Sequence, residues 1–208
     1  MRIVLLALFT ISLIAVGQAQ DKRGPIKQAT LALQIGAFDF QTAQKIRSKS
    51  LSKVISDKEW SNLGESDMAF GLSYIKGISK FFDYSINGFA GSVRYPVRNT
   101  KGNTVGVAPS KFLFEADVSI HMKLLPDNYI VVPYLSGGVG GSSWNGRFEA
   151  FMPFGGGLQF GVGENYFAFS NFQYRVPVTQ GANYHFLYSL GFGGPIGKSV
   201  TPEVKSIP

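Results

Sequence analysis

Cysteine is absent from this 208-residue chain, and histidine occurs only twice. The first absence excludes a disulfide scaffold and any Cys-based zinc or iron–sulfur site, and two histidines are too few for a histidine-rich metal centre. Charged residues make up 16% of the chain, well below the roughly 25% of an ordinary globular protein. Disorder requires low hydrophobicity and high charge, so this composition argues against it. We therefore expect a folded protein with no metal and no cofactor.

Glycine and aromatic residues are what the chain has in excess. It contains 25 Gly, 18 Phe and 9 Tyr but only 2 Trp, and its net charge is +7. A basic chain of this kind can bind nucleic acid or an anionic membrane surface. Its length suits one domain, and all-β barrels of this size are common.

Residues 1–19 have the three parts of a secretory signal peptide. Arg2 supplies the positive start, residues 3–16 are an apolar run, and small residues end at Ala19. The run is too short for a membrane-spanning helix, which needs roughly 18 or more apolar residues. We expect cleavage after Ala19, so the chain is exported and no nucleic-acid partner is expected.

The rest of the chain alternates between apolar and polar residues with a period of two. In residues 111–124 apolar side chains occupy one face and mostly charged ones the other, with Leu113 as the exception. Side chains alternate faces along a strand, so this segment is predicted as a β-strand. In residues 82–97 the phase slips near Gly88, as a β-bulge would cause. The other predicted strands cover residues 30–40, 67–74, 129–142, 150–162, 171–176 and 184–193.

The composition of the two strand faces indicates a membrane barrel. A soluble sandwich places its bulky apolar residues inside, whereas here one face holds Gly, Ser, Asn, Gln and ions. The apolar face ends in Phe and Tyr, as the aromatic girdle of a membrane barrel does. We predict an all-β, eight-stranded, antiparallel, up-and-down transmembrane β-barrel with its polar face inside. A lipocalin-like soluble barrel is the alternative.

The lengths of the connections predict the orientation of the barrel. Outer-membrane barrels have short periplasmic turns and longer external loops, and this alternation places both termini in the periplasm. The short turns are 76–80, 125–128 and 163–165, and the mostly longer connections are 41–66, 98–110, 143–149 and 179–183. The expected regions are a periplasmic segment at 20–29, the barrel at 30–197 and a short periplasmic tail at 198–208.

Three glycine- and aromatic-rich segments resemble strands of OmpA-type outer-membrane β-barrel proteins. They are PYLSGGVG at 133–140, FGGGLQ at 154–159 and FLYSLGF at 186–192. The resemblance covers roughly residues 30–197 and implies a location in the outer membrane of a Gram-negative bacterium. Larger relatives continue into a peptidoglycan-binding domain, whereas this chain stops at Pro208, so cell-wall anchoring is not expected.

Polar side chains on the inward faces of the strands form the densest candidate site. The lumen of an eight-stranded barrel is just filled by side chains, and buried charges must be paired. We therefore predict a paired polar network that plugs the lumen, with a gated ion or proton path as the alternative. Its predicted members are Arg94, Glu115, Asp117, Ser119, His121, Lys123, Gln159, Asn171, Gln173 and Arg175.

Asp117, Ser119 and His121 also have the residue types of a serine hydrolase. Residues two apart on one strand are separated by roughly 6–7 Å, and this group points inward, away from outer-leaflet lipid. A nucleophile without access to its substrate makes a poor enzyme. We expect no catalytic residues and no enzymatic activity.

The first long loop, residues 41–66, has apolar residues at loosely helical spacing with cations between them. A short amphipathic helix is expected there, packed over the barrel rim or lying at the lipid headgroups. Its cations either contact lipopolysaccharide phosphates or face water. They are Lys45, Arg47, Lys49, Lys53 and Lys58.

Three classes of function follow from these patterns. The preferred one is a structural or complex-docking barrel of the cell envelope. Its expected partners are outer-membrane lipid, lipopolysaccharide and other outer-membrane proteins. The alternatives are a narrow channel or transporter for small solutes and, less favoured, a lipid-modifying enzyme. The lack of a convincing catalytic set favours the first.

Overall fold

The computed structural model describes residues 26–61, 66–94, 96–98, 104–107, 109–162, 166–180 and 182–196. The predicted signal peptide at 1–19, the predicted turn at 163–165 and the predicted tail at 198–208 lie outside the described residues.

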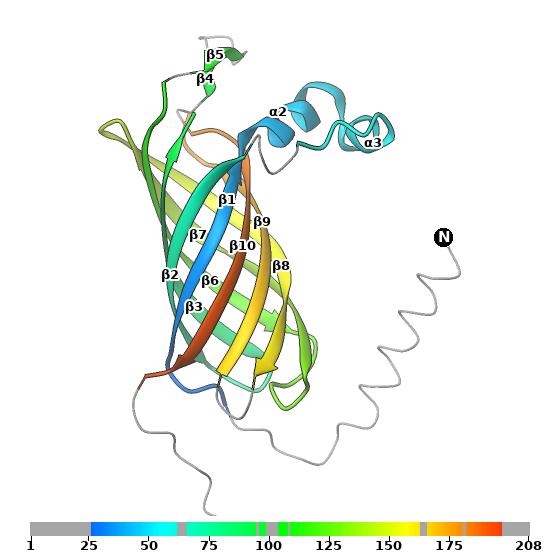
Figure 1. Cartoon of the computed structure of the whole chain (residues 1–208), viewed down its shortest axis with the longest axis vertical. Helices are drawn as coiled ribbons and strands as arrows, with labels where there is room; N and C mark the ends of the chain where they lie inside the picture. The colour runs from blue at the N-terminus through cyan, green and yellow to red at the C-terminus, as the bar shows by residue number, and fades with distance from the viewer. Residues whose placement is uncertain are drawn as a thin grey trace, which may run out of the picture.

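Eight long antiparallel strands form a closed barrel (Figure 1). They are β1 (Thr30–Asp39), β2 (Asp67–Gly77), β3 (Phe82–Val93), β6 (Lys111–Lys123), β7 (Val131–Trp144), β8 (Arg147–Val162), β9 (Tyr166–Pro177) and β10 (His185–Pro195). Each strand pairs with the long strand before and after it in the chain, and β1 closes the ring by pairing with β10. The predicted eight-stranded up-and-down barrel is confirmed.

The two ends of the barrel differ in what connects the strands. At the loop end, α2 (Phe40–Lys49) and α3 (Leu51–Ser56) follow β1, and β4 (Pro96–Arg98) pairs with β5 (Thr104–Val107) after β3 (Figure 1). At the turn end, residues 78–81 and 124–130 make short connections. The helix expected in the first long loop is present as two short helices. No helix in the described part of the chain is long and apolar enough to cross a membrane.

Helix α2 begins where β1 ends because Asp39 caps it. The Asp39 carboxylate accepts a hydrogen bond from the Thr42 backbone N–H at 2.8 Å, which satisfies one of the helix's unpaired donors. The next side chain, Phe40, is buried beside Phe38 inside the loop end of the barrel. The chain therefore leaves the barrel wall and lays the first turn of α2 over its mouth.

The outer surface of the barrel is apolar. Large outward-facing side chains remain exposed, among them Leu33 at 70% and Phe70 at 63% of their full accessible area. Near the turn end, aromatic rings form pairs on this surface, such as Tyr74 with Tyr84 at 6.0 Å between ring centres. Apolar surface on this scale marks a membrane or protein contact, and a barrel with aromatic margins matches a membrane-spanning one.

The phase slip expected near Gly88 is wrong. Strand β3 pairs with both neighbours without a register shift, so no bulge is present. The pattern looks irregular because two inward-facing residues of β3, Phe89 and Val93, are apolar. They pack with Leu113 and Leu187 in one cluster inside the loop end of the barrel. This cluster also explains why Leu113 breaks the alternation of its own strand.

The long connection expected at residues 143–149 is also wrong. Strands β7 and β8 continue to Trp144 and Arg147, and only Asn145 and Gly146 join them. Both turn residues have positive φ, 50° and 77°, as a type I′ turn requires, and this turn matches the twist of the flanking strands. The loop end therefore includes one tight hairpin.

Candidate functional site

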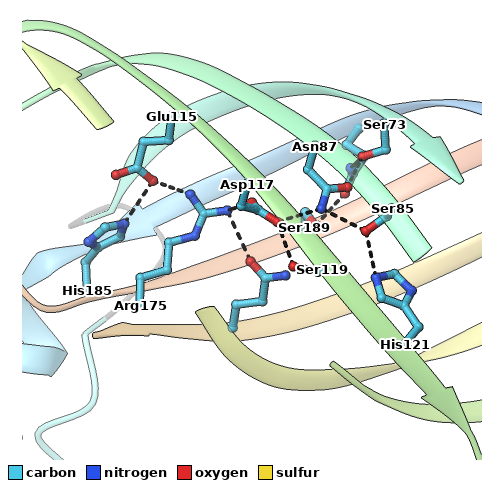
Figure 2. A network of polar contacts seen from close by, with 12 residues as sticks. Ser73, Ser85, Asn87, Glu115, Asp117, Ser119, His121, Arg175, His185 and Ser189 are labelled. Atoms are coloured by element: carbon cyan, nitrogen blue, oxygen red, sulfur yellow. Dashed lines mark hydrogen bonds and ion pairs between the residues drawn. The ribbon is translucent and has the colours of Figure 1, made fainter. Parts of the chain in front are cut away.

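The interior of the barrel holds a connected polar network, which we call the lumen network (Figure 2). Its side chains come from the inward-facing positions of six strands, β1, β2, β3, β6, β9 and β10. The members are Gln34, Ser73, Ser85, Asn87, Glu115, Asp117, Ser119, His121, Gln173, Arg175, His185 and Ser189.

Arg175 occupies the centre of the lumen network and its side chain is completely buried. From β9 the guanidinium reaches across to β6, where it donates to Glu115 and, over 3.1 Å, to Oδ2 of Asp117. It also donates to Oε1 of Gln173 at 3.1 Å, and its central carbon lies 4.8 Å from the centre of the Phe151 ring. A buried charge is tolerated only with partners of this kind.

Glu115 is held from a second side by His185. Nε2 of His185 lies 3.1 Å from the Glu115 carboxylate, and Nδ1 lies 3.1 Å from the backbone oxygen of Asn183. The Phe40 ring lies against this imidazole, with 4.5 Å between the ring centres. The first residue of α2 therefore packs directly on the lumen network.

A chain of neutral side chains continues from Asp117 around the barrel wall. The Asn87 amide donates to Oδ1 of Asp117 at 2.7 Å, and the Ser73 hydroxyl donates to Oδ1 of Asn87 at 2.5 Å. The Gln34 amide donates to Ser73, and the Ser189 hydroxyl donates to Oε1 of Gln34 at 2.8 Å. These bonds run from β6 through β3, β2 and β1 to β10, so the network both crosses the lumen and follows its wall.

A second group of charges, the turn-end cluster, lies at the other end of the lumen. Lys27, which precedes β1, lies 2.7 Å from Asp83 and 3.4 Å from Asp127. Lys123 bonds the same two carboxylates at 2.8 and 2.5 Å. The Gln159 amide donates to Oδ1 of Asp127 at 3.0 Å. Two cations and two carboxylates are thus mutually paired there.

Aromatic rings fill the interior around these polar groups. Phe169 packs with Ala32 and Ile75 in a second apolar cluster. Its ring lies on Gly191 of the neighbouring strand, where a Cβ atom would overlap the ring. Glycine is needed at this position because a ring approaches the backbone closely.

The structure places most of the predicted lumen residues in one of the two polar groups. Asn171 lies opposite Ser189 on the inward phase of β9, and its Oδ1 has no hydrogen bond within the described residues. Glu115, Asp117, Ser119, His121, Gln173 and Arg175 belong to the lumen network, and Lys123 and Gln159 to the turn-end cluster.

The prediction that Arg94 faces the lumen is wrong. Arg94 follows the end of β3, its side chain is 50% exposed, and its Nε lies 3.0 Å from Oδ1 of Asp67. The alternation of β3 does not slip, so position 94, next to the inward-facing Val93, points to the outer side of the barrel. The error therefore has the same cause as the bulge expected at Gly88.

Several members of the two polar groups were not predicted as site residues. Gln34 and Asn87 lie on strands with weaker alternation, whereas Ser73 lies on the polar face of a clearly alternating strand. Continuing the alternation through each strand would have found all three. Lys27 lies before β1, where no strand period indicates a direction for its side chain. Only the folded chain shows that Lys27 enters the turn-end cluster.

The serine, histidine and aspartate of β6 do not form a catalytic relay. The Ser119 hydroxyl donates to Asp117 at 2.7 Å, whereas Nε2 of His121 lies 3.0 Å from Oγ of Ser85. A serine–histidine–aspartate relay needs the histidine within hydrogen-bond reach of the serine, and here Ser119 bonds Asp117 while His121 bonds Ser85. Within the described residues, no three His, Asp or Glu side chains are grouped to hold a metal ion.

Outside the barrel, α2, α3 and residues 57–61 form what we call the arm. Nε1 of Trp60 donates to the Tyr188 hydroxyl at 3.0 Å, and its ring centre lies 5.5 Å from that of Phe186. The Arg47 guanidinium lies 3.8 Å from the centre of the Tyr184 ring. The arm is thus fastened to the outer face of β10 and the residue before it.

The arm engages some of its own cations. Lys49 lies 2.6 Å from Oε1 of Glu59, and this hydrogen bond lowers the pKa of the Glu59 carboxyl. Lys45 donates to the Glu59 backbone oxygen at 3.1 Å. Lys53 and Lys58 take part in no ion pair found among the described residues. Of the five predicted contacts for phosphate, these two have their charges least engaged within the chain.

No protein-family model matches this chain, and no curated protein matches its sequence. Among solved structures, the outer membrane protein OprG from Pseudomonas aeruginosa is similar with a TM-score of 0.54 and 12% identity, over 84% of this chain and 98% of OprG. Neisserial surface protein A (NspA) is similar with a TM-score of 0.53 and 10% identity, over 83% of this chain and 99% of NspA. At these identities the likeness shows the fold, which is that of small outer-membrane β-barrels, as the resemblance in the sequence predicts.

Proposed function

We propose that this protein is an integral outer-membrane barrel of a Gram-negative bacterium, with a structural or complex-docking role and a lumen closed by its own side chains. The observation that carries the proposal is the complete burial of Arg175 between carboxylates of β6 and side chains of β9. These strands are three steps apart in a ring of eight. The guanidinium therefore spans the interior where a solute would have to pass.

The layers on either side of Arg175 support a closed lumen. Toward the loop end, the apolar cluster around Phe89 and Leu187 fills the interior. Toward the turn end, Phe169 and its neighbours precede the paired charges of Lys123 and Asp83. An ion entering from either end would have to displace packed rings and break charge-assisted hydrogen bonds, which are the strong ones in proteins.

Conductance in planar lipid bilayers tests the closed lumen. We expect no stepwise current from the purified, folded protein. Stable current steps would overturn this part of the proposal and favour the narrow channel. The same preparation must show the folded, unboiled band in a detergent gel, so that absence of current is not due to unfolded protein.

The docking role predicts a partner protein that stays bound to the barrel during purification. Ser119 is buried and bonds Asp117 instead of a histidine. The site therefore does not support lipid-modifying chemistry, and the protein is proposed to be no enzyme. Purification of the native protein in mild detergent should recover a partner outer-membrane protein in fixed ratio. Recovery of the barrel alone would leave only the structural role.

The arm supports contact with lipopolysaccharide. It carries five cations at the loop end, which faces outward in the proposed orientation. Lys49 pairs with Glu59, Lys45 bonds a backbone oxygen and Arg47 lies on the Tyr184 ring. Among the described residues, Lys53 and Lys58 are found in no ion pair or ring contact. Phosphates attract such cations through charge complementarity. Replacing Lys53 and Lys58 with Gln should lower the amount of lipopolysaccharide that co-purifies, whereas Lys76→Gln at the turn end should not. Equal amounts from all variants would contradict this contact.

A further inference from the structure

A groove on the outer face of the barrel lies at the β7–β8 hairpin, four strands around the ring from β1, where the arm begins. In Figure 1 this hairpin stands at the loop end, away from α2 and α3. The groove has a volume of about 570 Å³. It is lined by Lys111, Phe112, Phe114, Ser143, Asn145 and Phe148.

The groove exists because one short side chain stands between two large ones. Ser143 of β7 pairs with Phe114 of β6 on one side and with Phe148 of β8 on the other. Phe148 is 84% exposed and Phe114 is exposed as well, so the two rings stand out from the wall while Ser143 forms the floor between them.

The floor continues toward the middle of the barrel as a row of small residues. Gly141, the next outward-facing residue of β7, pairs with Ala116 and Ala150. A Cβ atom at Gly141 would meet only the backbone oxygen of Glu149, at 3.5 Å. The space above Gly141 is therefore open, and a linear apolar chain leaving the groove can lie along this row.

A cation stands at the loop-end mouth of the groove. Lys111 begins β6, and its Nζ donates to Oδ1 of Asn145 at 2.6 Å. Asn145 is neutral, and Lys111 is exposed and belongs to none of the ion pairs found in the described part of the chain. The hairpin turn thus holds an uncompensated positive charge beside an apolar slot.

We propose that this groove binds lipid A of the outer leaflet, with an acyl chain between Phe114 and Phe148 and a phosphate on Lys111. A slot walled by rings fits an apolar chain, and a single cation at its mouth complements an anion attached to that chain. The inference rests on the proposed outer-membrane placement, which puts the loop end in the leaflet that carries phosphorylated lipid A. It assigns a lipid site separate from the arm.

The test is native mass spectrometry of the folded full chain in mild detergent, titrated with lipid A and with lipid A lacking its phosphates. Lys111→Gln should weaken binding of phosphorylated lipid A about five-fold, the effect of one exposed charge pair, without changing binding of the dephosphorylated form. Ser143→Leu fills the slot and should weaken binding of both forms. Lys76→Gln, an exposed lysine at the turn end, should change neither.

Two results would overturn the inference. One is that both Lys111→Gln and Ser143→Leu bind phosphorylated lipid A with the affinity of the unmodified protein. The other is equal binding of the two lipid forms by the unmodified protein. A heat-dependent band shift must be retained by every variant, because it reports the folded barrel. If the shift is retained and lipid selectivity is absent, the lipid A site is refuted but the outer-membrane barrel is not. If the native protein is not recovered with the outer membrane, the proposed function is refuted as well.

Discussion

At the scale of single residues, Arg175 is the side chain on which most of the interior depends. Arginine suits this position because its planar fork offers several donors in fixed directions, and here it serves Glu115, Asp117 and Gln173 together. Lysine would carry the same charge at a single point. The network therefore depends on the shape of the guanidinium as well as on its charge.

Arg175→Leu should destabilise the barrel by about 3–5 kcal/mol, because it leaves two buried carboxylates without their cation. Arg175→Lys should fall between this variant and the unmodified protein. The measurement is the urea dependence of unfolding in detergent micelles or lipid vesicles. Arg94→Leu is the matched control, because the exposed Arg94–Asp67 pair is expected to contribute about 1 kcal/mol or less. Equal stability of Arg175→Leu and Arg94→Leu would contradict the central role of Arg175.

Gly191→Ala should destabilise the barrel by about 1–3 kcal/mol, because its Cβ would overlap the Phe169 ring and overpack the interior. Adding Phe169→Leu should recover part of this loss, since the two residues are in contact and their effects are not additive. Gly88→Ala serves as the control: its Cβ would face outward, 3.9 Å from the Phe114 ring. The measurement is the same urea unfolding assay. A Gly191→Ala variant as stable as the unmodified protein would show that the Phe169 ring can move aside.

At the scale of elements, the tight turn of the β7–β8 hairpin depends on Asn145 and Gly146, which both have positive φ. Gly146→Val should cost about 1–2 kcal/mol, because a side chain at φ of 77° crowds the backbone. Gly146→Asn should cost less, since asparagine tolerates this conformation. Unfolding midpoints of the two variants give the comparison. A valine variant as stable as the asparagine variant would mean that the turn rearranges.

The arm is the second element whose position can be tested. Trp60→Ala removes both the hydrogen bond to Tyr188 and the ring contact with Phe186, so the arm should detach from β10. We expect faster tryptic cleavage at Lys49 and Lys53 with an unchanged unfolding midpoint of the barrel. Ile55→Ala, at an exposed position of α3, should be cleaved at the rate of the unmodified protein. Unchanged cleavage of Trp60→Ala would show that other contacts hold the arm.

At the scale of the whole molecule, ring closure makes the barrel a single cooperative unit. β1 and β10 pair along ten residues, so no strand edge is left open along the wall, as a membrane requires. We expect the folded protein to run at a different position in detergent gels before and after boiling, and to be recovered with the outer membrane. No shift on boiling, together with recovery in the soluble periplasmic fraction, would defeat the membrane-barrel assignment.

How far the sequence alone reaches can be judged from particular strands. In residues 111–124 the alternation predicts which side chains face inward, because the face of a strand residue is a local property with a period of two. In β3 the same logic fails, because Phe89 and Val93 face inward toward an apolar cluster contributed by distant strands. The Asn145–Gly146 turn is local chemistry that the sequence contains, because Asn-Gly is the residue pair that a type I′ turn prefers.

What the sequence by itself determined is therefore the number of barrel strands, the inward and outward faces of most of them and the fold, since these depend on neighbours within a few residues. What only the tertiary structure decided is which inward side chains meet. Arg175 and Glu115 are 60 residues apart, and Lys27 and Gln159 are 132 apart. Such partners depend on the register between strands and on closure of the ring, and a single strand's periodicity carries no information about either.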